Sequence, residues 1–97
     1  MMNYQDKPLR ERKVKESIKD LWNKNEIEIK PHARKRMTER NITIKDMKNI
    51  LWYGRLVDYS MPEGAWRYKL AGKALDNKNG ACVVEIEDQL IIVTVID

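Results

Sequence analysis

The sequence has little cysteine and histidine and no long hydrophobic run, and these shortages exclude several classes of protein. Its single cysteine, Cys82, excludes an internal disulfide framework and argues against a zinc site built by this chain alone. No apolar run approaches the ~18 residues of a membrane-spanning helix. The N-terminus also lacks the apolar core of a signal peptide. We therefore expect a cytoplasmic protein that uses no metal or cofactor and does not contact a membrane.

Charge is distributed unevenly along the 97 residues, although the net charge is only +4. Residues 1–55 hold fifteen Lys and Arg against eight Asp and Glu, giving +7. Residues 56–97 hold four against seven, giving −3. A positive half favours a polyanionic partner such as a nucleic acid or an acidic protein, and a solvated basic helix face is the alternative.

The N-terminal half has the periodicity of helices. Apolar residues at helical spacing predict helices over residues 7–23, 31–41 and 43–54, with a short strand at 27–30. Pro8 suits the first turn of the first helix. Thr43 and Asp46 match a capping box at the start of the third helix, and Gly54 provides its C-terminal stop.

From residue 56 onward the apolar residues alternate with a period of two, which predicts strands. These strands cover residues 56–60, 66–70, 81–87 and 90–96, and the last two form a hairpin. The final strand is apolar on both faces, which places it inside the sheet. The sequence thus predicts one α+β domain in the order α-β-α-α-β-β-β-β, with helices packed on a mostly antiparallel sheet.

The most informative segment lies in the second predicted helix. His32, Arg36 and Arg40 fall at i, i+4 and i+8, beside an apolar seam formed by Ala33 and Met37. Two arginines four residues apart repel each other on an isolated helix. Such a column is easiest to explain if it faces an anion, and RNA or DNA phosphate is the obvious one.

Each residue of this column also has a purely structural interpretation. A lone histidine after a proline at a helix start is commonly a capping or packing residue. The two arginines can equally pair with Glu28, Glu39 or a carboxylate of the sheet.

The predicted strand at 66–70 adds further candidates. Tyr68 shares a face with Trp66 and Leu70, which favours core packing over chemistry. Arg67 and Lys69 point the other way and are better placed to meet a ligand, although strand lysines also protect sheet edges.

The chain resembles a group of small bacterial domains of unknown function. The resemblance covers residues 26–97, whereas residues 1–25 form a basic amphipathic helical extension outside it. Those domains are similar in topology to RelE-type and MqsR-type toxins of type II toxin–antitoxin modules. The matching positions are His32, Ala33, Arg36, Met37, Arg40, Ile42, the helix-ending Gly54, the run Tyr68-Lys69-Leu70, Gly72 and the terminal hairpin.

The resemblance implies a RelE-like fold and an mRNA-cleaving toxin neutralised by a cognate antitoxin, often a zinc-finger protein. Its substrate would be mRNA, free or on the ribosome. Cleavage through the RNA 2′-hydroxyl needs a proton acceptor, cations on the phosphate and a proton donor for the 5′-oxygen. In this hypothesis His32 is the acid or base. The supporting residues are Arg36, Arg40 and Arg67 on the phosphate, Tyr68 as donor or stacking group, and Arg34, Lys35 and Lys69 as RNA contacts.

One departure from the toxin pattern leaves a second function open. RelE-type nucleases commonly place Arg, His or Tyr near the C-terminal strand, and residues 90–96 contain none. The preceding strand carries Glu85 and Glu87 instead. Either the active site is rebuilt around the helix column and the 66–70 strand, or nuclease activity has been lost. In the latter case the chain is a non-catalytic accessory module that binds nucleic acid or protein.

Overall fold

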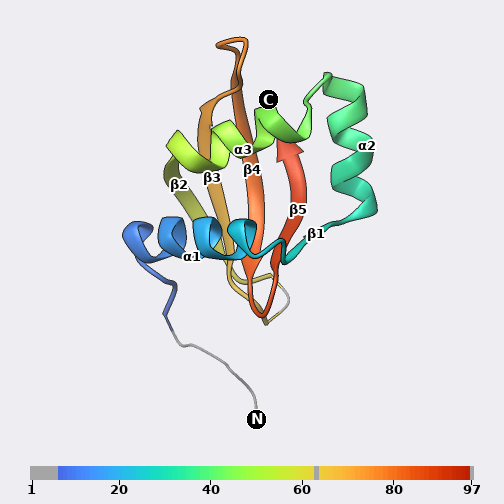
Figure 1. The fold of residues 1–97 in the computed structure, drawn as a ribbon. Coiled ribbons are helices and arrows are strands. Elements are labelled where there is room, and N and C mark those ends of the chain that lie inside the picture. Colours follow the sequence, from blue (N-terminus) through green and yellow to red (C-terminus); the bar gives the residue numbers. More distant parts are fainter. Residues whose placement is uncertain (1–6, 63, 97) are drawn as a thin grey trace.

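Three helices and five strands make up the described part of the chain, in the order that the sequence predicts (Figure 1). The computed structural model describes residues 7–62 and 64–96. The elements are α1 (Glu11–Asn23), β1 (Ile27–Ile29), α2 (Pro31–Arg40), α3 (Ile44–Tyr53), β2 (Arg55–Ser60), β3 (Arg67–Lys73), β4 (Asn79–Ile86) and β5 (Leu90–Ile96). The first six residues of the predicted N-terminal extension lie outside the described residues.

The strands form one mixed sheet in the order β1-β5-β4-β3-β2. β1 runs parallel to β5, and the other three pairings are antiparallel. β5 is hydrogen-bonded on both sides, which confirms the placement expected from its two apolar faces. The predicted α+β class is therefore confirmed.

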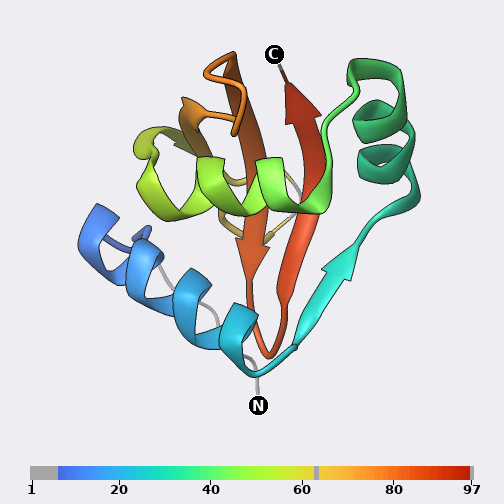
Figure 2. The ribbon, with the colours of Figure 1, turned by 45° about the horizontal axis from the view of Figure 1, so that its top comes forward.

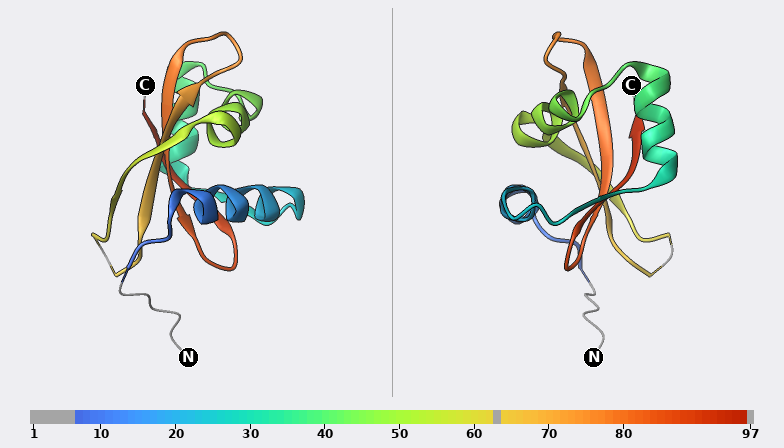
Figure 3. Two further views of the ribbon diagram at one scale, coloured as in Figure 1. Left: turned by 90° about the vertical axis from the view of Figure 1, so that its left-hand side faces the viewer. Right: turned by 45° about the vertical axis from the view of Figure 1, so that its right-hand side comes forward.

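The helices cover one face of this sheet. Figure 3 (left) shows α1 and α3 on the same side, and no described helix crosses the opposite face. Alternate strand residues point toward the helices and close the core. Its buried side chains are Val14 and Ile18 of α1, Ala33 and Met37 of α2, Met47, Ile50 and Leu51 of α3, and Tyr68, Leu70, Cys82, Val84, Leu90, Ile92 and Val95 of the sheet.

The first helix begins later than the sequence predicts. α1 starts at Glu11 rather than at residue 7, and its N-cap Arg10 has an extended backbone. A long-range contact explains the difference, because the Leu9 backbone N–H donates to the Tyr68 hydroxyl at 2.9 Å. Leu9 therefore binds the sheet, and Pro8 precedes the helix instead of opening it.

The third helix begins with the predicted capping box. The Asp46 backbone N–H donates to Thr43 Oγ1 at 3.0 Å, and the Thr43 backbone N–H donates to Asp46 Oδ2 at 2.9 Å. Asp46 Oδ1 also accepts from the backbone N–H of Leu75 at 3.0 Å. One carboxylate thus caps α3 and holds the loop between β3 and β4 against it.

The third helix ends at Gly54, as predicted, but for a different reason. Gly54 has an extended backbone (φ −75°) and not the left-handed conformation typical of a C-terminal glycine. A Cβ at this position would lie 2.5 Å from the Ala71 carbonyl oxygen. A Cβ on Gly72 would lie 2.9 Å from the Gly54 Cα. Glycine is required here because the end of α3 and strand β3 approach each other backbone to backbone.

We expect Gly54→Ala to destabilise the fold by about 3 kcal/mol, because the added methyl group overpacks two backbones that cannot move apart independently. Gly64→Ala is the matched control. Gly64 has a positive φ of 82°, but an added methyl group would meet no atom within 4 Å, so its strain should cost only about 1 kcal/mol. Urea unfolding of both variants measures the difference. An equal or smaller loss at Gly54 would contradict the close-approach explanation.

We also expect the Asp46 cap to stabilise the fold in a pH-dependent way. Hydrogen bonds from the backbone N–H of Thr43, and then of Leu75, hold the pKa of Asp46 below its ordinary value. A lowered folded-state pKa contributes stability above the ordinary carboxyl pKa, and this stability is lost as pH falls through the folded value. Asp46→Ala should therefore cost about 1 kcal/mol at neutral pH and less in acid.

Urea unfolding at neutral pH and in acid tests this expectation. Asp20→Ala provides the control, because Asp20 makes only an exposed ion pair with Lys24 and should change stability by less than about 0.5 kcal/mol. A cost at Asp46 that is the same at both pH values would contradict the role of its charge.

Candidate functional site

Most of the basic residues singled out by the sequence lie on α2, at one edge of the sheet. Pro31 opens the helix, and Asn41 ends it in the left-handed conformation (φ 55°). Ala33 is fully buried and Met37 is 8% exposed, so both anchor the helix to the core. His32, Arg36 and Arg40 follow beside this seam at intervals of one turn. We call these three residues the α2 column.

The position of α2 follows from the shortness of β1. β1 pairs with β5 only from Leu90 to Ile92, and the backbone N–H of Lys30 makes the last bond, to the Ile92 carbonyl at 3.0 Å. Beyond that point α2 lies beside β5 in place of a strand (Figure 2). Arg36 Nε donates to the Val95 carbonyl there at 3.4 Å. Arg36 thus lies half-buried at the otherwise unpaired edge of β5.

One of the carboxylates considered as a partner for this column is engaged elsewhere. Glu28 forms an ion pair with Lys30 at 3.3 Å. Among the described residues, no ion pair involves His32, Arg34, Lys35 or Arg36. His32, Arg34 and Lys35 are all exposed. The positive charge of Arg34 and Lys35 is therefore available to an external anion.

Arg67 does not join this group. It lies on the uncovered face of the sheet, opposite Glu85 of β4, and its Nε is 2.8 Å from Glu85 Oε2. The two side chains are only 28% and 15% exposed, so the charge of Arg67 is neutralised within the fold. Arg67 is also two strands across and three residues along the sheet from the position of Val95, a backbone separation of about 14 Å. Its ion pair with Glu85 and its place on the uncovered face set Arg67 apart from Arg36.

Lys69 lies on the same uncovered face as Arg67. Its neighbours across the strands are Asp58 of β2 and Val83 of β4. No described ion pair includes Lys69. It stays a candidate RNA contact, but it lies away from the α2 column.

Tyr68 lies on the opposite, helix-covered face and is 2% exposed. Its hydroxyl accepts the backbone N–H of Leu9, and burial raises the pKa of this phenol above its ordinary value. An enclosed hydroxyl that positions the N-terminal segment cannot reach a phosphate at the α2 column. The structure thus places Tyr68 and Arg67 apart from the α2 column, and the catalytic role of the five residues stays a prediction.

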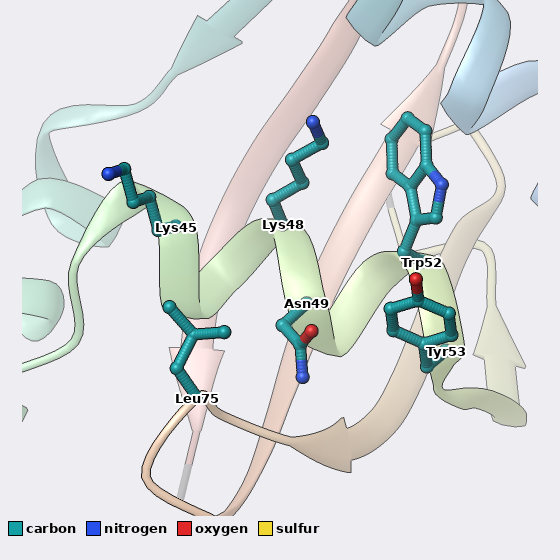
Figure 4. A pocket seen from close by; sticks show the side chains of 6 residues that line it. All are labelled: Lys45, Lys48, Asn49, Trp52, Tyr53 and Leu75. Carbon is teal, nitrogen blue, oxygen red and sulfur yellow. The ribbon is translucent and has the colours of Figure 1, made fainter.

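A second surface was missed by the sequence analysis. Lys45, Lys48, Asn49, Trp52, Tyr53 and Leu75 line a hollow of about 380 Å³ on the outer side of α3 (Figure 4). The available signal was the position of Trp52 and Tyr53, which fall outside the core stripe formed by Met47, Ile50 and Leu51. The loop residue Leu75 could not have been assigned to this surface from its spacing.

The geometry predicts that the α2 column contributes little to stability. Arg36→Ala removes one long hydrogen bond and should change the free energy of unfolding by less than about 1 kcal/mol. Its chain neighbour gives the contrast, because Met37→Ala empties part of the core and should cost about 2–5 kcal/mol. Thermal and urea unfolding measure both. A large loss at Arg36 would show that it is a structural residue.

No described helix is both long and apolar enough to cross a bilayer.

The comparisons with known proteins give one match. A family model described as "Domain of unknown function (DUF4258)" matches residues 29–97. Comparison with curated proteins and with solved structures gave no match. The matched region contains the α2 column and begins after α1, although α1 shares the same core. The boundary that the sequence predicts between the extension over residues 1–25 and the domain over residues 26–97 stays a prediction. Because the match covers most of the chain, the protein belongs to the DUF4258 domain family.

Proposed function

We propose that this chain is the toxin of a type II toxin–antitoxin module, with the RelE-like arrangement that its sequence pattern implies. It acts as a metal-independent endoribonuclease on mRNA in the cytoplasm and is held inactive by a cognate antitoxin, for which a zinc-finger protein is one candidate. The observation that carries this proposal is the α2 column, where His32 and Arg36 have no carboxylate partner among the described residues.

The electrostatics of α2 favour a phosphate ligand. Arg34, Lys35 and Arg36 are consecutive cations on one helix, and charges of one sign held close together favour the binding of an anion. Guanidinium groups bind phosphate oxygens through two parallel hydrogen bonds. Arg34 and Lys35 extend the positive surface around the helix and would contact flanking phosphates of a single strand.

His32 supplies the proton transfer in this proposal. An imidazole at the column would accept the proton of the RNA 2′-hydroxyl, whose oxygen then attacks the adjacent phosphorus. Arg36 and Arg40 would stabilise the charge that develops on the phosphate oxygens. The 5′-oxygen leaves with a proton returned by the imidazolium, and the products are a 2′,3′-cyclic phosphate and a free 5′-hydroxyl.

A non-catalytic accessory module that binds nucleic acid or protein is the second candidate, and a specific observation favours it. Arg67 is paired with Glu85, and Tyr68 is enclosed in the core. His32 is then the one proton-transfer group left from the predicted catalytic set. An exposed histidine among arginines can bind RNA without cleaving it.

Cleavage and binding of a labelled single-stranded RNA separate a nuclease that cuts free RNA from an accessory module that binds RNA. Wild-type protein is compared with His32→Gln and with the double variant Arg36→Ala/Arg40→Ala, all in excess EDTA. Lys7→Ala/Lys13→Ala is the control, because it removes the same charge from exposed residues in and near α1.

We expect His32→Gln to lose cleavage by about 100-fold or more while keeping its RNA affinity. The double arginine variant should lose both activities, and its slope of log affinity against log salt should fall by about 1.4 in magnitude. The control variant should lose much less cleavage and much less RNA affinity than the double arginine variant. Binding that depends on the arginines without any cleavage would favour the accessory module. RNA binding unaffected by the double arginine variant would refute both the nuclease and the nucleic-acid-binding form of the accessory module.

A further inference from the structure

The hollow on α3 has the features of a protein-docking site. It lies on the side of the helix away from Met47, Ile50 and Leu51, which face the core. We call it the α3 hollow, lined by the six residues of Figure 4. None of them belongs to the α2 column, so docking at this surface does not depend on RNA cleavage.

Exposed apolar groups border the hollow. Tyr53 is 76% exposed and Leu75 is 61% exposed. The position of Leu75 is fixed, because its backbone N–H donates to Asp46, and Asn49 Nδ2 donates to the Lys73 carbonyl at 2.8 Å on the same loop. An apolar hollow held open by such hydrogen bonds is preformed for a ligand.

Lysines surround the hollow without acidic partners. Lys45 and Lys48 line it, and Lys19 of α1 lies 5.6 Å from the Trp52 ring centroid, close to the 4.9 Å of Lys48. No described ion pair includes any of these three lysines. The nearest carboxylate on α3, Asp46, is bound to backbone N–H groups. The charge of the rim therefore complements an acidic ligand.

The aromatic groups favour a peptide over RNA. The Trp52 ring already holds two ammonium groups and an edge contact with Trp22, at 6.3 Å between centroids and 81° between planes. Binding of single-stranded nucleic acid relies on open aromatic faces for successive bases. The wall formed by Leu75 instead suits an aliphatic or aromatic side chain.

We propose that the α3 hollow docks an acidic peptide segment of a partner protein. The segment inserts one apolar side chain between Leu75 and Tyr53, and its carboxylates pair with Lys45, Lys48 and Lys19. The proposal identifies the partner by its chemistry, an acidic segment with one apolar side chain. The partner binds on the side of α3 that faces away from the sheet.

Selection from a random peptide library displayed on phage tests the proposal with the full chain. Wild-type protein is the bait, and the variant Lys48→Glu/Leu75→Ser is used to remove peptides that bind elsewhere. Lys13→Glu is the matched control, because it makes the same charge reversal at an exposed position of α1. Circular dichroism confirms that each variant is folded, and a labelled uridine oligonucleotide is titrated in parallel.

The proposal predicts enrichment of peptides rich in Asp and Glu around one apolar residue. Their affinity should fall at least about tenfold with Lys48→Glu or with Leu75→Ser alone, and stay unchanged with Lys13→Glu. The absence of peptides that depend on the hollow would overturn it, as would enrichment of neutral or basic peptides. It would also be overturned if Lys48→Glu weakened uridine binding while no acidic peptide was enriched.

Discussion

The shortness of β1 is the constraint on which the arrangement of this fold depends. β1 pairs with only the first half of β5, so the outer edge of β5 needs other cover. α2 provides it directly after β1, with Ala33 and Met37 in the core and Arg36 on the Val95 carbonyl. Anchoring the helix by these residues fixes the rotation of α2, and this rotation places the α2 column beside the edge of the sheet.

Basic residues of this fold differ in whether a carboxylate of the same chain pairs with them. Several basic residues pair with carboxylates within the structure, as Arg67 does with Glu85 and Arg55 with Glu11. On α2 and α3, basic residues such as Arg36 and Lys48 have no ion-pair partner among the described residues. Unpaired charge of one sign on rigid helices contributes little to stability but directs association with anions. The two helices therefore present separate surfaces to external ligands.

Local patterns predicted much of the fold because the interactions behind them are local. The capping box of Thr43 and Asp46 spans three residues, and the α2 column follows from helical spacing alone. The interior position of β5 follows from its two apolar faces. The early start predicted for α1 was wrong because Leu9 binds Tyr68, which is far away in the sequence.

The candidate site was predictable only in part, for the same reason. Spacing on one helix places His32 and Arg36 together, but the register of β3 and β4 decides that Arg67 meets Glu85. No pattern within the 66–70 segment reveals that partner. The α3 hollow also depends on the loop that carries Leu75, which Asp46 holds in place. Contacts between segments distant in the sequence thus determine the parts of the site that residue spacing could not predict.

The most direct test of the proposed toxin activity is the integrity of total mRNA after the chain is induced in a bacterial host. Wild-type protein should arrest growth and leave cut transcripts, including cuts that require the ribosome. His32→Gln, at the same level of folded protein, should leave both growth and transcripts intact. Normal growth with intact mRNA in cells that contain folded wild-type protein would contradict the proposal.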